Sequence, residues 1–431
     1  MDSTVQSVLQ FVEENDVKFI RLAFCDLMGN LKNVSILPGE LAGAFETGVA
    51  VDIAAVTDRF ENEPCDLRLF PDAATLSVLP WRPQSGRVMR LFCNIRNEEG
   101  EAFRADGRYV LQRAVNRLAE AGWDCRMGTK CEFYLFLRDE QGRPTQRPQD
   151  EAGYLDVAPL DGGENVRREI CLTLEEMSLR PSMSHHEQGP GQNEIDFRRA
   201  APVTAADDVV TFKQVVRTVA ANSGLFASFG PKPLAGQPGS GMHIHIAPIK
   251  DGRNLFAPDE NGRLSEQAAS FMTGIVERAP ELCAFTNPMP DSYARLKDLN
   301  VDPDRGSIVR WIAGPTPEKA CLEVRLPDAA CEPYLTFALL LTAGLEGMEH
   351  KRIPGTISSW WVNRAGKEAL EKLPASIEEA VAKAEDSKFV REVLQSSAMY
   401  VWLKRKRKEL DRFAAALDTE AIFRAANFSA L

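Results

Sequence analysis

Four of the five histidines in this chain fall in two short clusters, His185-His186 and His243-Ile244-His245. Histidine binds metal ions and transfers protons near neutral pH, so this clustering predicts chemistry. The second cluster is typical of a β-strand, in which alternate side chains point to one face, so His243 and His245 should lie on the same side. The alternative is that these are ordinary histidines held by hydrogen bonds in the core or in turns.

Acidic residues accompany these histidines. Glu187 and Glu194 lie on either side of a Pro-Gly turn, and a hairpin there would bring both carboxylates to one face. Glu132 begins a short apolar strand, and Glu323 shares a strand face with Arg325. Carboxylates inside a sheet are costly unless they are paired or bind a metal. Acids with imidazoles and no thiolate favour Mg²⁺ or Mn²⁺, with zinc ranked lower.

Several arginines lie near the Glu323 strand in the sequence, namely Arg295, Arg305, Arg310 and Arg325. Guanidinium groups beside acidic metal ligands suit phosphate or carboxylate substrates, because they bind those groups through two parallel hydrogen bonds. The alternative is that each arginine pairs with a surface acid. The sequence contains neither GxxxxGK[ST] nor GxGxxG, so a bound nucleotide would not use a P-loop or a Rossmann turn.

The composition of the 431 residues, 44% hydrophobic and 26% charged, is that of a globular protein and excludes disordered, collagen-like and disulfide-scaffold proteins. A net charge of −11 argues against partners such as duplex DNA or an anionic membrane. The basic run 404–408 is interpreted as a solvated helix face. Scattered cysteines, no signal peptide and no membrane-length apolar run predict reduced thiols and a cytoplasmic location.

The elements that must position the candidate residues alternate along the chain. Strands are expected first, and a charged turn at 97–100 indicates a domain boundary. Beyond it, helices alternate with strands, and the segment after Pro333 is helical almost to the end. The expected strands are 17–22, 32–36, 88–95, 132–137, 242–247 and 322–326, and the expected helices are 109–121, 166–179 and 209–221. This pattern predicts a small, mostly β domain followed by a larger α+β domain.

Three motifs, at 185–194, 232–245 and 322–335, resemble the glutamine synthetase family, and the resemblance runs from about 17 to 413. It implies an α+β fold with an N-terminal β-grasp domain (1–99) and a glutamine synthetase-type α/β catalytic domain (100–431). It also implies a homo-oligomer, a dodecamer of stacked rings, with active sites shared between neighbouring subunits. The family reaction uses ATP to phosphorylate the γ-carboxylate of glutamate, after which ammonia or another amine displaces phosphate.

The resemblance also assigns roles to residues. One Mg²⁺ or Mn²⁺ would bind Glu132, Glu187 and Glu194, and a second would bind His243 and Glu323. The substrate would contact Gly239, Arg295, Arg325 and Tyr154, and ATP would contact Arg305, Arg310 and His245. Asp52 would reach the neighbouring subunit's site and help to deprotonate ammonium, with Arg295 and Arg305 as further catalytic groups.

The chain departs from the family at several of these places. Lys130 stands where the family has a second-metal acid, and Cys321 stands where it has a phosphate-binding arginine. At about 4 Å and an effective dielectric near 20, each unit charge pair contributes ~4 kcal/mol, enough to abolish a second metal site. The family's flap is reduced to 296–304, in which Asp298 or Asp302 is the candidate to replace its proton-accepting glutamate.

Three functions follow from these observations. The first is an ATP-dependent ligase that forms a γ-glutamyl amide from glutamate and ammonia or, given the short flap, a bulkier amine. The second is a one-metal enzyme that acts on a glutamate-like acid without ATP. The third is a non-catalytic assembly or regulatory homologue.

Overall fold

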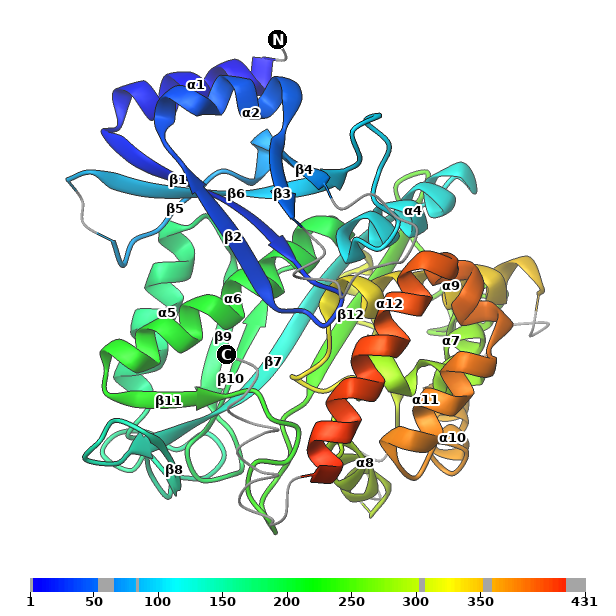
Figure 1. Ribbon diagram of the computed structural model, residues 1–431. Coiled ribbons are helices and arrows are strands. Elements are labelled where there is room, and N and C mark those ends of the chain that lie inside the picture. Colours follow the sequence, from blue (N-terminus) through cyan, green and yellow to red (C-terminus); the bar gives the residue numbers. More distant parts are fainter. Residues whose placement is uncertain (1–2, 53–65, 83–84, 302–306, 352–358, 416–431) are drawn as a thin grey trace.

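The computed structural model describes residues 3–52, 66–82, 85–301, 307–351 and 359–415. The chain is built on two β-sheets, with the N-terminal sheet lying above the larger one in Figure 1. The N-terminal sheet is mixed, in the order β2-β1-β6-β4-β3, with β5 added to β6, and only its β1–β6 pair is parallel. Its strands are β1 (Val17–Cys25), β2 (Leu31–Ile36), β3 (Val49–Asp52), β4 (Asp66–Pro71), β5 (Ser77–Val78) and β6 (Arg87–Arg96).

Two helices, α1 (Ser3–Glu14) and α2 (Leu41–Thr47), belong to this N-terminal part. The sequence analysis predicted only strands here. The signal for α1 is the spacing of Val8 and Val12, which lie one helical turn apart and are both buried. The predicted strands at 17–22, 32–36 and 88–95 are confirmed as β1, β2 and β6.

The second sheet has nine strands and follows the order β14-β15-β12-β7-β10-β9, with β8, β11 and β13 attached beside it. Its central strand β7 pairs with β12, β10, β11 and β8, so one strand organises the sheet. The bounds are β7 (Asp124–Arg138), β8 (Pro144–Pro148), β9 (Pro181–His186), β10 (Gln192–Phe197), β11 (Leu225–Ser228), β12 (Met242–Lys250), β13 (Arg253–Asn254), β14 (Val309–Ile312) and β15 (Cys321–Val324).

Helices cover the apolar face of this sheet. The helix α6 packs on β7 and β11, and α9 packs on α4, α6 and α7. The bounds are α4 (Gly107–Glu120), α5 (Glu164–Glu176), α6 (Pro202–Asn222), α7 (Glu266–Thr286), α8 (Ser292–Val301), α9 (Pro333–Glu349), α10 (Ser359–Leu370), α11 (Ile377–Asp386) and α12 (Lys388–Ala415). The predicted helices are confirmed, whereas α7, which contains Pro280, and α8 were missed. No described helix is both long and apolar enough to cross a membrane.

The basic run 404–408 lies on α12, but it is only partly the solvated face that the sequence predicted. Lys406 is buried, and its ammonium donates to the Pro288 carbonyl oxygen at 3.0 Å. Arg405 pairs at 2.9 Å with Asp26, which directly follows β1 of the N-terminal sheet. The run therefore attaches α12 to the rest of the molecule, because charge count alone does not show which side of a helix is covered.

A buried guanidinium joins the two parts of the molecule. Arg108, in the first turn of α4, pairs with Asp72, which follows β4, at 2.8 Å. The same side chain pairs with Asp207 of α6 at 3.1 Å, and the Tyr334 hydroxyl donates to Asp207 at 2.6 Å. A buried charge is tolerated only when its partners are present, so this network depends on all of its members.

We expect Asp207→Ala to lower the free energy of unfolding by about 3–5 kcal/mol, because Arg108 would then stay buried with half of its counter-charge. Urea unfolding followed by circular dichroism measures this. Glu368→Gln is the matched control, since it removes an exposed ion pair with Arg364. Equal unfolding midpoints for the two variants would show that Asp207 does not hold the two parts together.

Candidate active site

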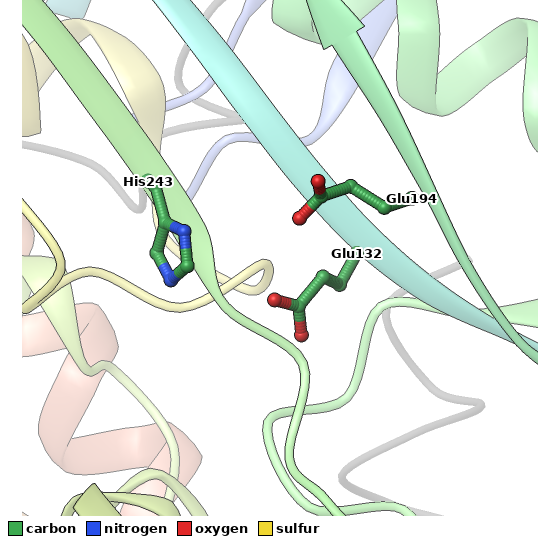
Figure 2. A group of neighbouring side chains, drawn as sticks. All are labelled: Glu132, Glu194 and His243. Atoms are coloured by element: carbon green, nitrogen blue, oxygen red, sulfur yellow. The ribbon is translucent and has the colours of Figure 1, made fainter. Parts of the chain in front are cut away.

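The pairing of β7, β10 and β9 brings two acids and a histidine, Glu132, Glu194 and His185, into one row, which we call the acid row. Glu132 of β7 lies opposite Glu194 of β10, and Glu194 lies opposite His185 of β9. Residues directly opposite each other in antiparallel strands point to the same face, so their side chains meet. Figure 2 shows the carboxylates of Glu132 and Glu194 beside the ring of His243, which comes from β12 on the other side of β7.

Two overlapping groups of these side chains have the spacing of a metal site. In the first, Glu132, Glu194 and His243 each offer a ligand atom within 4.8 Å of the others. In the second, Glu194 is joined by His185 and Glu187 at the same spacing. The hairpin therefore does bring Glu187 and Glu194 to one face. Glu132 and Glu187 were expected to bind the same ion. In the structure, each of them forms a group with Glu194, but the two do not belong to the same group.

The charges in this row favour a bound cation. Burial and the neighbouring Glu194 and Glu187 carboxylates raise the pKa of Glu132 well above its usual range. Burial lowers the pKa of His243 to about 3, which keeps its imidazole neutral and able to bind a metal. Carboxylate oxygens with one imidazole fit Mg²⁺ or Mn²⁺, so the residues present match one such ion at Glu132, Glu194 and His243.

His185 has a different character from His243. Its ring nitrogen lies 3.2 Å from a Glu194 oxygen, and this hydrogen bond raises the pKa of His185 to about 9. We interpret His185 as a positively charged partner of Glu194. Its neighbour His186 is fully buried between Asp150, at 2.9 Å, and the Glu187 carbonyl oxygen, at 2.7 Å. The interpretation of a core histidine is therefore correct for His186, whose partner Asp150 was not predicted.

Backbone and amide groups orient the Glu132 carboxylate. The same oxygen accepts the Gly241 N–H at 2.9 Å and the Gln192 side-chain amide at 3.0 Å. That amide also donates to the Gly239 carbonyl oxygen at 3.2 Å. These contacts fix the carboxylate toward His243, and the loop 239–241 is thereby tied to the acid row.

Gly239 lies where no side chain fits. A Cβ atom there would be 2.5 Å from the Pro231 carbonyl oxygen and 2.8 Å from the side chain of Arg295. Arg295 is buried, and its guanidinium donates to the carbonyl oxygens of Leu326, at 3.0 Å, and Arg325, at 3.1 Å. The predicted neighbours Gly239, Arg295 and Arg325 thus do come together beside Glu132.

The predicted sharing of faces is also confirmed for His243 with His245 and for Glu323 with Arg325. The Glu323 carboxylate, however, is already surrounded by two arginines and a histidine. Arg310 lies 2.9 Å from it, His245 3.2 Å and Arg325 3.3 Å. Within the described residues, Glu323 belongs to no group of three possible metal ligands.

Lys130 lies directly opposite His243 on β12 and Asp196 on β10. Its ammonium is 2.8 Å from Asp196 and 3.9 Å from Glu194. The positive charge of Lys130 therefore lies beside His243. At this position a second metal ion would need a negatively charged ligand. The side chains around Lys130 do not fit a second divalent ion there, and Asp196, the partner of Lys130, was missed in the sequence analysis.

The remaining predicted residues are dispersed. Asp52 ends β3 in the N-terminal part, and its side chain is exposed. The Tyr154 ring, also exposed, meets the His185 ring edge-on at 5.6 Å. Asp298 on α8 forms an ion pair with Lys232, so that acid is already engaged. Arg305 and Asp302 lie outside the described residues.

We expect Glu132→Gln to weaken Mn²⁺ binding by at least about 10-fold, since it removes the charge of a ligand and keeps its shape. Equilibrium dialysis with manganese detection measures the dissociation constant. Glu140→Gln, in the exposed turn after β7, is the control. Unchanged Mn²⁺ affinity in Glu132→Gln would place the ion elsewhere.

We also expect Lys130→Glu to add one Mn²⁺ per chain, because it exchanges a repelling charge beside His243 for a carboxylate. Manganese titration monitored by electron paramagnetic resonance counts the bound ions. Lys130→Met, which removes the charge and supplies no ligand, separates lost repulsion from a gained ligand. An identical ion count in all three proteins would contradict our reading of Lys130.

Both parts of the chain match models of a known protein family. The family models for the glutamine synthetase β-grasp domain and catalytic domain match residues 16–98 and 104–423. Glutamine synthetase of Methanosarcina mazei is 39% identical, covering 96% of each chain, and that of Thermus thermophilus is 36% identical with the same coverage.

Solved structures agree as well. Apo GmaS is 29% identical with a TM-score of 0.81, covering 96% of this chain and 97% of that one. Plasmodium falciparum glutamine synthetase has a TM-score of 0.84 at 20% identity, covering 97% and 98%, and shows the fold alone. The match of both domains, together with these relatives, shows that the chain is a ligase that belongs to the glutamine synthetase family.

Proposed function

We propose that this enzyme is an ATP-dependent carboxylate–amine ligase that joins an amine to the γ-carboxyl of glutamate or a glutamate-like acid. The observation that carries the proposal is the grouping of Glu132, Glu194 and His243 beside two arginines, Arg295 and Arg325. A divalent ion held by the first three would neutralise phosphate charge and polarise the transferred group.

The arginines support recognition of a carboxylate. Arg325 lies beside Arg295, and its Nε is buried without a hydrogen-bond partner in the described structure. An unpaired buried donor is costly, so a ligand oxygen at this position would recover a charge-assisted hydrogen bond. Gly239, which has no side chain, lets the Arg295 side chain pack against the backbone of the 239–241 loop.

Use of ATP is supported from two sides. A relative of the same fold, GmaS at 27% identity, has been solved with ADP. In this chain, the half-exposed side chain of Arg310 on β14 is held by Glu323 at 2.9 Å. A phosphate group would either replace the Glu323 carboxylate as the partner of Arg310 or bind the opposite side of the Arg310 guanidinium.

The surroundings of His185 favour an organic amine over ammonium. The Tyr154 ring forms an apolar wall against the His185 ring, and the exposed side chains Leu155 and Val157 follow it. Ammonium gains nothing from such surfaces, whereas an alkylamine buries its carbon chain there. Asp298, a candidate to take the proton of ammonium, is engaged by Lys232.

The same exposed residues support assembly into a homo-oligomer with shared sites. Tyr154, Leu155, Val157 and Leu160 are between 49% and 70% exposed and lie in one short segment beside His185. Gathered apolar surface of this kind is typical of protein interfaces. A neighbouring subunit that covered this surface would also exclude water. This exclusion would protect an acyl phosphate intermediate from hydrolysis.

We expect phosphate release from ATP to require glutamate, Mg²⁺ and an amine, with kcat/KM at least about 10-fold higher for a primary alkylamine than for ammonium, the scale of a few buried methylene groups. A coupled phosphate assay over ammonium, methylamine, ethylamine and propylamine measures this. Glu132→Gln is the inactive control. A preference for ammonium would contradict the proposal that the substrate is an organic amine, but not the proposal of an ATP-dependent ligase.

A second function, one-metal chemistry on a glutamate-like acid without ATP, is favoured by the Lys130–Asp196 pair. Calorimetric titration of Mg·ATP separates the two. Absence of ATP binding, combined with retained Mn²⁺ and glutamate binding, would overturn the ligase proposal in favour of this second function.

A further inference from the structure

A cavity of about 410 Å³ lies on the opposite side of the larger sheet from the acid row. Its walls come from the turn 27–30 between β1 and β2, from α6, from the segment 329–332 and from α12, drawn orange to red in Figure 1. Phe229 lines the cavity and packs against Phe133, which precedes Glu132 on β7 and therefore points to the other face. Small-molecule sites span roughly 300–1,000 Å³, so the size is suitable.

The charge of this cavity is opposite to that of the chain. The protein carries a net charge of −11, but the basic side chains around the cavity outnumber the acidic ones. The acids are Glu332 and Glu409, and both are engaged. Glu332 accepts two backbone N–H groups at the start of α9, and Glu409 pairs with Lys406.

Three of the basic side chains have no carboxylate partner in the part of the chain that the structure describes. Lys213, Arg217 and Arg412 form no ion pair with any carboxylate among the described residues. Lys213 and Arg217 lie one turn apart on α6 and so share a face. The contacts of Arg217 are with the Phe229 ring, 5.3 Å away, and Lys213 donates to the Cys331 carbonyl oxygen at 3.0 Å.

We propose that this cavity binds a small anion whose carboxylate or phosphate group is held by Arg217, Lys213 and Arg412. A guanidinium donates two parallel hydrogen bonds to either group, and a bound anion would give these three cations the ion pairs that they do not form among the described residues. The aromatic side chains of Phe285 and Trp402, 4.3 Å apart between ring centroids, form a wall for the rest of the molecule. An anion would bind in this cavity whether or not the acid row catalyses the ligase reaction.

The cavity also contacts the active site through its wall. Ala329, which lines the cavity, donates its N–H to the Ser240 carbonyl oxygen at 3.2 Å, and Gly241 donates to Glu132. Lys213 holds Cys331 in the same wall segment. An anion that draws Lys213 away from Cys331 would shift the segment that carries these contacts. Because such coupling is reciprocal, occupancy of the two sites should affect both affinities.

The test is calorimetric titration of the full chain with inorganic phosphate, AMP and succinate, which separate a phosphate group, a phosphate with an aromatic body, and a carboxylate. We expect at least one probe to bind, and we expect Arg217→Gln and Arg412→Gln each to weaken it about 10-fold. Glu132→Gln, on the other face of β7, should leave that binding within twofold. Mn²⁺ binding by Arg217→Gln checks that its acid row is intact.

Arg412 is exposed on α12, so Arg412→Gln carries the test if Arg217→Gln fails to fold. Two results would overturn the proposal. One is that none of the three probes binds. The other is that every probe that binds keeps its affinity in both arginine variants, which would assign the binding to the active site.

Discussion

The register of β7 with its two neighbours is the constraint on which the site depends. It sets Glu194 opposite Glu132 on one side and His243 opposite Lys130 on the other. A slip of one residue in either pairing would turn a whole set of side chains to the apolar face, where α6 packs. The hydrophobic side chains that alternate with the acids, such as Phe133 and Cys131, therefore hold the charges in place by being buried themselves.

The sheet gathers like charges, and much of the surrounding structure compensates for that. Two carboxylates side by side repel each other, and burial strengthens the repulsion. The chain offsets it with His185 on Glu194, Lys130 on Asp196, and Arg310 and Arg325 on Glu323. Glu132 has backbone and amide donors but no fixed cation among the described contacts, which makes it the position most in need of a metal ion.

The sequence predicted those parts of the site that follow from local periodicity. The shared face of His243 and His245 needs only the alternation of a strand, and the hairpin that joins Glu187 to Glu194 needs only the Pro-Gly turn. The contact between Lys130 and Asp196 depends on which strands are neighbours and in what register, which no local pattern contains. The helix α7 was missed because Pro280 interrupts its pattern, although Ser265 caps its first turn.

The buried Arg108 has a consequence for how this protein can be rearranged. Its partners lie in different parts of the fold, Asp72 after β4 and Asp207 on α6, so one buried positive charge depends on acids from both parts. Replacing the N-terminal part with that of a relative would preserve each sheet. If the relative lacks an acid at the position of Asp72, the Arg108 guanidinium would lose one of its two carboxylate partners. A working chimaera must therefore carry an acid at the position of Asp72, whatever the rest of the donor sequence is.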